Sequence, residues 1–122
     1  MQATPELLKR FKLFESLDAT DLKELSNECQ VERFARRAMI LTAGKKETKV
    51  CFLFEGRLQG IDFTVDGREV GMYFVNPGDF CGELCIFDKG NQPEHVIALI
   101  SSVVMFISTS SLRDLADRHP AI

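Results

Sequence analysis

The chain has 122 residues, of which 45% are hydrophobic and 27% are charged, so it can bury a single core and is expected to form one soluble domain. Its 15 basic residues are outnumbered by 18 acidic ones, and the net charge of −3 argues against a nucleic-acid-binding surface on this segment. The N-terminus lacks the basic start and apolar stretch of a signal peptide, and the longest apolar region, residues 96–107, is well short of the ~20 residues that cross a bilayer. We therefore expect a cytoplasmic protein with no membrane contact.

Two short helices are predicted before the strand region. Thr4 and Pro5 place a capping hydroxyl ahead of a proline at the first helical position. Residues 18–21, Asp-Ala-Thr-Asp, form the cap of a second helix. The inward positions of these helices and of their connection are apolar: Leu7, Leu8, Phe11, Phe14, Leu17, Leu22 and Leu25.

The middle of the chain predicts strands joined by tight turns. Apolar residues alternate on both sides of residues 65–68, where Asp66-Gly67 is a strong signal for a hairpin turn. Glu55-Gly56 follows an apolar segment and is interpreted as a second tight turn. Strands joined in this way are expected to form a meander.

The last third of the chain predicts two more strands and a helix. The apolar region 96–107 is interrupted by Ser101-Ser102 and is interpreted as two buried strands around a turn. A third helix is expected to start at Ser111, to point Leu112 and Leu115 inward, and to end near His119.

One segment between these strands has the character of an anion site. Residues 76–79, Asn-Pro-Gly-Asp, form a further turn. Residues 82–87, Gly-Glu-Leu-Cys-Ile-Phe, are too few for a full helix but suit a single helical turn. The unpaired N–H groups at the start of such a turn favour a negatively charged ligand.

Taken together, the motifs at residues 52–56, 66–69, 77–80 and 82–84 resemble the cyclic nucleotide-binding domain of the CRP/FNR (catabolite activator) family of bacterial transcription regulators. The resemblance implies a mostly β fold with short helices (α+β), a double-stranded β-helix or jelly-roll-like β-roll of about eight antiparallel strands. It also implies that residues 1–122 are one sensory domain, excised before a dimerisation helix and a helix-turn-helix domain.

The resemblance assigns roles to the residues of the Gly-Glu-Leu turn. In the family, backbone N–H groups of this turn hold the cyclic phosphate, which implies Gly82, Leu84 and Cys85 here. The family's glutamate accepts a hydrogen bond from the ribose 2′-hydroxyl, which implies Glu83, although a carboxylate in a first helical turn also stabilises the helix dipole without any sugar. The other pocket positions that the resemblance implies, beside Leu84, are Gly60, Met72 and Tyr73.

The arginine that the family uses to neutralise the phosphate is missing. The family places Arg-Ser/Thr-Ala about ten residues after the turn, where this chain has Pro93-Glu94-His95, and no arginine occurs between Arg68 and Arg113. Lys89 is the only lysine in that stretch. His95 could donate one hydrogen bond as a partial substitute, or it could be an ordinary residue at a strand entry. Because a charge-assisted contact contributes roughly 1.5–3 kcal/mol, we expect no cofactor and no tight binding of a cyclic nucleotide in the usual pose.

These observations predict the effector-sensing domain of a CRP/FNR-type transcription regulator, with a non-standard ligand or none. The expected partners are a small-molecule effector, DNA only through a domain outside this chain, and a second copy in the whole protein, while the 122 residues alone are expected to be monomeric. The alternative is a regulatory module that binds cyclic AMP or cyclic GMP and acts on a different output.

A metal or thiol redox sensor is a third interpretation. Cys81 and Cys85 with His95 could supply three ligands, but their spacing is not that of a zinc knuckle, and no metal site is assigned. Cys29 and Cys51, like the other two cysteines, are typical of small buried apolar residues. No motif of a nucleophile elbow, a zinc protease or a phosphate loop is present, so no enzyme and no catalytic residue is predicted.

Overall fold

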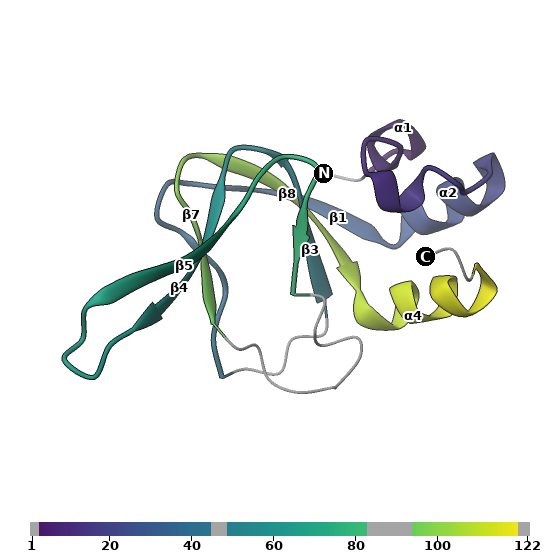
Figure 1. Cartoon of the computed structure of the whole chain (residues 1–122). Helices are drawn as coiled ribbons and strands as arrows, with labels where there is room; N and C mark the ends of the chain where they lie inside the picture. The colour runs from purple at the N-terminus through teal and green to yellow at the C-terminus, as the bar shows by residue number, and fades with distance from the viewer. Residues whose placement is uncertain (1–2, 45–48, 83–93, 120–122) are drawn as a thin grey trace.

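The computed structural model of the chain describes residues 3–44, 49–82 and 94–119. Strands form two layers, and the helices gather beyond one end of them (Figure 1). The strands are β1 (Cys29–Phe34), β2 (Met39–Leu41), β3 (Lys49–Glu55), β4 (Leu58–Phe63), β5 (Glu69–Val75), β6 (Phe80–Cys81), β7 (His95–Ala98) and β8 (Ser102–Ser108). The helices are α1 (Pro5–Leu8), the 3₁₀ turn η1 (Lys12–Phe14), α2 (Ala19–Asn27) and α4 (Thr109–Arg118). This antiparallel β-roll with short helices confirms the predicted fold class.

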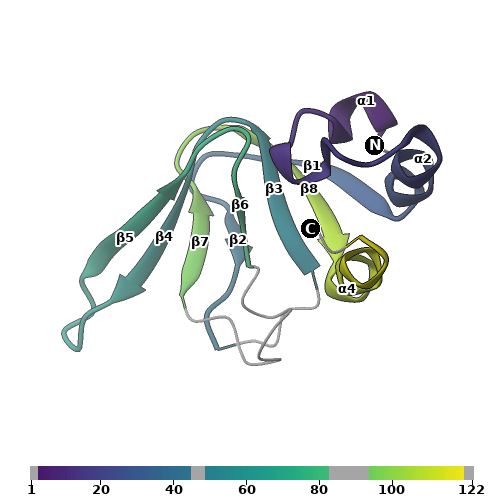
Figure 2. The ribbon, with the colours of Figure 1, turned by 45° about the vertical axis from the view of Figure 1, so that its right-hand side comes forward.

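The strands form two four-stranded sheets. The first sheet has the order β1-β8-β3-β6 and the second has the order β2-β7-β4-β5, with every neighbouring pair antiparallel. Figure 2 shows β6 alongside β3 at the edge of the first sheet. The prediction of a meander through Glu55-Gly56 is wrong, because β3 and β4 belong to different sheets. The chain crosses from one sheet to the other at this turn, and a Cβ atom on Gly56 would overlap the side chain of Ser102.

The strands of residues 96–107 also separate between the sheets. Both are buried and a turn joins them, as predicted, but β7 pairs with β2 and β4 whereas β8 pairs with β1 and β3. A turn signal in the sequence therefore marks where a strand ends without showing which sheet the next strand joins.

The hairpin of β4 and β5 is confirmed. Its loop runs from Thr64 to Arg68, whose backbone groups form a 2.9 Å hydrogen bond from the Thr64 N–H to the Arg68 carbonyl oxygen. Gly67 adopts a positive φ of 85°, and the Asp66 carboxylate accepts a hydrogen bond from the Thr64 hydroxyl. In Figure 1 the hairpin extends away from the helices as the far end of the molecule.

The core has two parts, one on each face of the first sheet. The helices cover one face, where the rings of Phe11 and Phe14 pack 5.1 Å and 5.3 Å from the ring of Phe52. The second sheet covers the other face. The inter-sheet core, as we call this second part, consists of Ile40, Leu41, Cys51, Leu53, Leu58, Val75, Cys81, Val96, Ala98, Val104 and Phe106. Since β3 contributes to both parts, five consecutive residues of this strand are buried.

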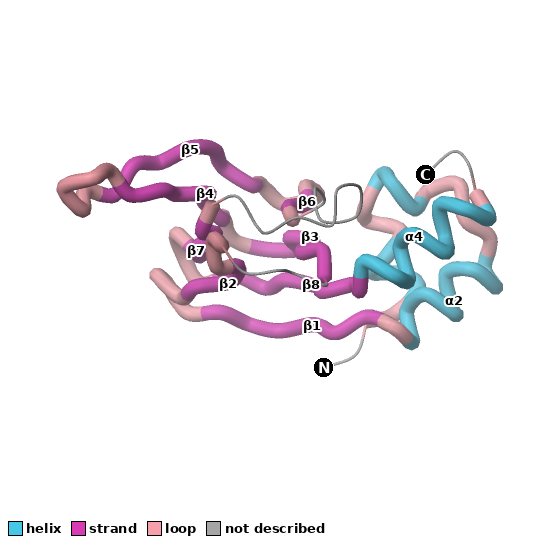
Figure 3. Tube along the Cα trace, turned by 90° about the horizontal axis from the view of Figure 1, so that it is seen from below, coloured by secondary structure: helices cyan, strands magenta, loops and turns pink. Residues whose placement is uncertain are grey.

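The helix caps are those that the sequence predicts, with one correction. The Thr4 and Asp18 side chains accept hydrogen bonds from backbone N–H groups of α1 and α2. Helix α4 begins at Thr109, two residues before the predicted start, because the Ser108 hydroxyl accepts the capping hydrogen bond from the Ser111 N–H. Figure 3 shows α4 beside α2, and the Nε2 atom of His119 lies 2.9 Å from Oδ2 of Asp21.

Within the described ranges, no helix has both the length and the apolar character that a membrane crossing requires.

Candidate effector-binding site

Strand β6 positions the start of the predicted phosphate-binding turn. This strand has two residues, and both pair with β3: Cys81 lies opposite Cys51, and Phe80 lies opposite Phe52. The rings of Phe80 and Phe52 are 5.3 Å apart. Gly82 comes directly after this strand, so the short ladder fixes where the turn begins.

Gly82 occupies a close-packed, left-handed position. Its φ of +86° is a conformation that glycine adopts without the steric cost of a Cβ atom. A Cβ atom there would lie 3.2 Å from Cδ1 of Leu41 and 3.5 Å from the carbonyl oxygen of Lys49. The tight entry that the sequence predicts is therefore present at Gly82. The neighbouring site residues Glu83, Leu84 and Cys85 lie outside the described residues, and their roles stay predictions.

Gly60 and Tyr73 are brought together across the hairpin. They are register partners on β4 and β5, and a Cβ atom on Gly60 would overlap the ring atoms Cε2 and Cζ of Tyr73. Gly60 is buried, and Tyr73 packs against the inter-sheet core. The tyrosine ring therefore lies over the glycine, and the space above Gly60 is filled from within the chain.

Met72 does not join this pair. Gly60 pairs with Tyr73 and the next residue, Ile61, pairs with Gly71, so Met72 is the extra residue of a β-bulge. Met72 is 56% exposed, whereas Tyr73 is partly buried. The structure thus separates two neighbours that the sequence places in one pocket wall.

His95 is the first residue of β7, as its interpretation as a strand-entry residue requires. Its Nδ1 atom accepts a 3.1 Å hydrogen bond from the N–H of Ala43, and its ring lies 5.5 Å from the ring of Phe63. An Nδ1 atom that accepts this bond carries no hydrogen, which leaves Nε2 as the atom that can donate. One hydrogen bond to an anion is the most that the neutral ring can supply.

Lys49 is a cation near this region that the family spacing does not indicate. Its carbonyl oxygen adjoins Gly82, and its Nζ atom lies 4.0 Å from the ring centroid of Phe106 in the inter-sheet core. The family spacing places the cation downstream of the turn, whereas Lys49 precedes the turn and is brought here by the long-range pairing of β3. The approach of Lys49 to Gly82 could be predicted only from the pairing of β3 with β6.

The described cysteines are buried and reduced. Burial, and next the negative charge of Glu28, raise the pKa of the Cys29 thiol to about 12. A hydrogen bond with Cys81, followed by burial, raises the pKa of the Cys51 thiol well above its ordinary value. Across the described ranges, no group of three or more His, Cys, Asp or Glu residues is arranged to hold a metal ion.

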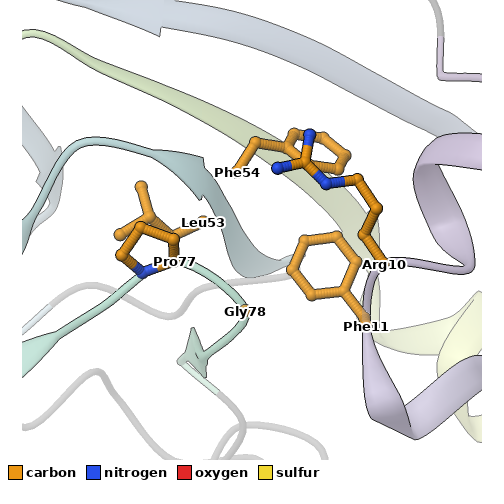
Figure 4. A pocket seen from close by; sticks show the side chains of 6 residues that line it. All are labelled: Arg10, Phe11, Leu53, Phe54, Pro77 and Gly78. Carbon is orange, nitrogen blue, oxygen red and sulfur yellow. The ribbon is translucent and has the colours of Figure 1, made fainter.

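A cleft of about 150 Å³ is lined by residues outside the predicted site. Figure 4 shows its lining, which comes from the segment after α1, from β3 and from the turn before β6: Arg10, Phe11, Leu53, Phe54, Pro77 and Gly78. The Arg10 guanidinium stacks over Phe54, with Cζ 5.6 Å from the ring centroid. Of the effector-pocket residues that the structure describes, none lines this cleft.

Comparison with known proteins places this geometry in a family. The family model of the cyclic nucleotide-binding domain matches residues 31–119, which include the strands from β2 to β8, the position of Gly82 and helix α4. The chain belongs to this family. Within it, the relatives and the motifs identify a CRP/FNR-type cyclic nucleotide-binding domain.

Two curated relatives of this CRP/FNR-type domain are bacterial regulators. The cAMP-activated global transcriptional regulator Vfr of Pseudomonas aeruginosa is 30% identical over 105 residues, which cover 83% of this chain and 49% of Vfr. The cAMP-activated global transcriptional regulator CRP of Pasteurella multocida is 25% identical over 123 residues, which cover 100% of this chain and 54% of that protein. The chain thus spans about half the length of the curated relatives it matches.

A solved structure supports the fold of the CRP/FNR-type domain. The sensor domain of the transcriptional regulator DNR from Pseudomonas aeruginosa superimposes with a TM-score of 0.84 at 24% identity. The match covers 95% of this chain and 79% of that sensor domain. The β-roll and its short helices are therefore those of a known fold.

Proposed function

We propose that this CRP/FNR-type domain senses an effector for a transcription regulator, and that cyclic AMP or cyclic GMP held in the usual pose is not that effector. The observation that carries the proposal is the missing guanidinium: no arginine occurs between Arg68 and Arg113. The position that the family gives to the arginine has Pro93, followed by the carboxylate of Glu94. A phosphate there lacks a charge-assisted contact of roughly 1.5–3 kcal/mol.

The packing of Tyr73 over Gly60 supports the same conclusion. Both positions belong to the pocket wall that the family resemblance implies, and the tyrosine ring covers the glycine. An aromatic ring in that space leaves less room for a nucleotide. The effector of this domain is then either a ligand of another shape, or absent, in which case the domain acts through its packing.

The wider role follows from the relatives. Vfr and the Pasteurella multocida CRP are by name cAMP-activated global transcriptional regulators. By analogy, the complete regulator would be a cytoplasmic homodimer that contacts DNA through a separate domain, and this domain would pass on the effector signal. It would carry out no catalysis itself.

The alternative, a module that binds cyclic AMP or cyclic GMP, is favoured by Gly82. Its left-handed backbone and close packing suit the start of a phosphate-binding turn. Such a turn could hold an anion through backbone N–H groups alone. The two proposals predict different affinities for a cyclic nucleotide, since backbone donors without the guanidinium should hold the cyclic phosphate only weakly.

Restoring the guanidinium tests which proposal is right. The double variant Pro93→Arg/Glu94→Ser supplies the positive charge and removes the neighbouring carboxylate. The matched control Pro93→Gln/Glu94→Ser makes the same backbone change without the charge. We expect at least tenfold tighter binding of cyclic AMP by the arginine variant than by its control, measured by calorimetry. The role given to the missing arginine would be contradicted if the arginine variant and its control bound cyclic AMP equally. The same equality would have to hold when both also carry Tyr73→Ala.

A further inference from the structure

Cys51 and Cys81 face each other across two neighbouring strands. They are register partners in the antiparallel ladder of β3 and β6, and they are 0% and 3% exposed in the inter-sheet core. Residues opposed in this way have Cα atoms about 4.5–5.5 Å apart, within the range of about 4.4–6.8 Å that a disulfide spans. A hydrogen bond with Cys81 is also the largest effect that raises the pKa of the Cys51 thiol.

We propose that Cys51 and Cys81 are a site of reversible disulfide formation that joins β6 covalently to β3 immediately before Gly82. Strand β6 has two residues and lies at the edge of the first sheet. Its ladder with β3 contains two register pairs, of which the cysteines are one. A covalent bond at this pair holds the strand from which the phosphate-binding turn starts.

The chemistry requires a two-electron oxidant, for which a peroxide is sufficient. The Cys81 thiolate attacks a peroxide oxygen and forms a sulfenic acid, and the other oxygen leaves as hydroxide and takes up a proton to become water. The Cys51 sulfur then attacks the sulfenic sulfur, and the sulfenic oxygen leaves with two protons as a second water. The two thiols lose two protons and two electrons, and one peroxide is reduced to two waters. A dithiol reverses the step by exchange.

The surroundings make this reaction slow and selective. The hydrogen bond with Cys81, followed by burial, raises the pKa of the Cys51 thiol, while the positive charge of Lys49 acts in the opposite direction, so little Cys51 thiolate is present at neutral pH. Access to an oxidant comes from opening of the two-residue edge strand β6, which carries Cys81. Once one sulfur is oxidised, its partner is already in contact.

Cys29 provides an internal control. It is as buried as Cys81, but its Sγ atom donates to the carbonyl oxygen of Leu25 at 3.1 Å and its register partner across β1 and β8 is Ile107. It has no opposing thiol across that ladder. If disulfide formation depends on which thiols lie opposite each other, an oxidant should link Cys51 to Cys81 and leave Cys29 reduced.

Peptide mapping of the folded chain after exposure to hydrogen peroxide tests the site. The masses of the linked peptides should show a Cys51–Cys81 bond and a loss of two hydrogens, both reversed by dithiothreitol. Cleavage after Glu83 separates Cys81 from Cys85, so the two are distinguished. The variant Cys85→Ser should keep the bond and Cys81→Ser should lose it. A bond between Cys81 and Cys85 instead, or no bond after prolonged exposure at pH 8.5, would overturn the proposal.

Two further readouts test the effect on β6. The oxidised chain should melt at least about 5 °C higher than the reduced chain, because the bond closes a long loop. Amide exchange in the peptide that contains residues 80–82 should slow by tenfold or more. A bond that forms without slowing exchange would overturn the claim that it holds β6. Control of effector binding by this bond rests on the proposed function, whereas formation of the bond does not. A titration in which no ligand binds would therefore count against the proposed function and not against the disulfide.

Discussion

The ring of Tyr73 lies over the backbone of Gly60, at a distance that excludes a Cβ atom on the glycine. The two residues are register partners on β4 and β5, at the edge of the inter-sheet core. Because the family resemblance implies both residues as parts of the pocket wall, this contact would shape that predicted pocket as well as the core. It also predicts that the two positions are coupled in stability.

The coupling can be measured with a double-mutant cycle. Gly60→Ala should destabilise the chain by about 1–3 kcal/mol, because the added methyl group has to displace the Tyr73 ring. In a Tyr73→Ala background the same change should cost less than ~1 kcal/mol, since the ring is gone. Denaturant unfolding of the four proteins gives the coupling energy. Equal costs of Gly60→Ala in both backgrounds would show that the ring does not lie over the glycine.

A second prediction concerns the close packing at Gly82. Gly82→Val should lower the free energy of unfolding by about 1–3 kcal/mol more than Gly67→Val does. Both glycines have a positive φ, of 86° and 85°, but a Cβ atom on Gly67 meets nothing within 4 Å. The difference therefore isolates packing from backbone strain. If the two variants melt alike, the proposed tight entry at Gly82 to the predicted phosphate-binding turn is wrong.

Helix caps and tight turns are the features that the sequence predicts well. Local signals were sufficient for the caps at Thr4 and Asp18 and for the Asp66-Gly67 hairpin, because each depends on residues a few positions apart. The start of α4 was misplaced because Ser108, Ser110 and Ser111 are all good capping residues, and the choice among them depends on where β8 ends.

The remaining differences come from long-range pairing. The family resemblance implies both Met72 and Tyr73 as pocket positions, and the β-bulge at Met72 depends on how β4 and β5 pair. The separation of β3 and β4 into different sheets and the approach of Lys49 to Gly82 depend on which strands become neighbours. Turn residues do not encode that choice.

A third prediction follows from the buried thiol of Cys29. Its pKa rises from 9.0 to about 12 in the folded chain, mainly through burial. The folded chain favours the protonated thiol. The stability that this thiol contributes is fully present below pH 9. It is lost as the pH rises toward 12, because the unfolded chain releases the proton at a lower pH than the folded chain does. The free energy of unfolding should therefore fall in this window by up to about 1.4 kcal/mol per pH unit for this group.

The variant Cys29→Ser is the matched control for that titration. A serine hydroxyl keeps a donor for the Leu25 carbonyl oxygen and does not ionise in this range. We expect the pH dependence between pH 9 and 12 to be shallower in the variant than in the unmodified chain. Parallel curves of unfolding free energy against pH would show that the thiol keeps its ordinary pKa.

A fourth prediction concerns Lys49 and the thiol pair. The positive charge of Lys49 lowers the pKa of the Cys51 thiol against the larger effects that raise it. Lys49→Met removes this charge, so alkylation of Cys51 at pH 8 should be slower in the variant, while alkylation of Cys29 should be unchanged. Quantitative mass spectrometry of the two peptides measures both rates. Slower alkylation of both cysteines alike would indicate a change in overall stability instead.

Calorimetric titration of the unmodified chain with cyclic AMP and with cyclic GMP tests the central claim most directly. Without a guanidinium at the phosphate and with the Tyr73 ring over Gly60, both nucleotides should bind with dissociation constants weaker than about 100 μM, and neither should raise the melting temperature appreciably. A dissociation constant in the low micromolar range for either nucleotide would contradict the account.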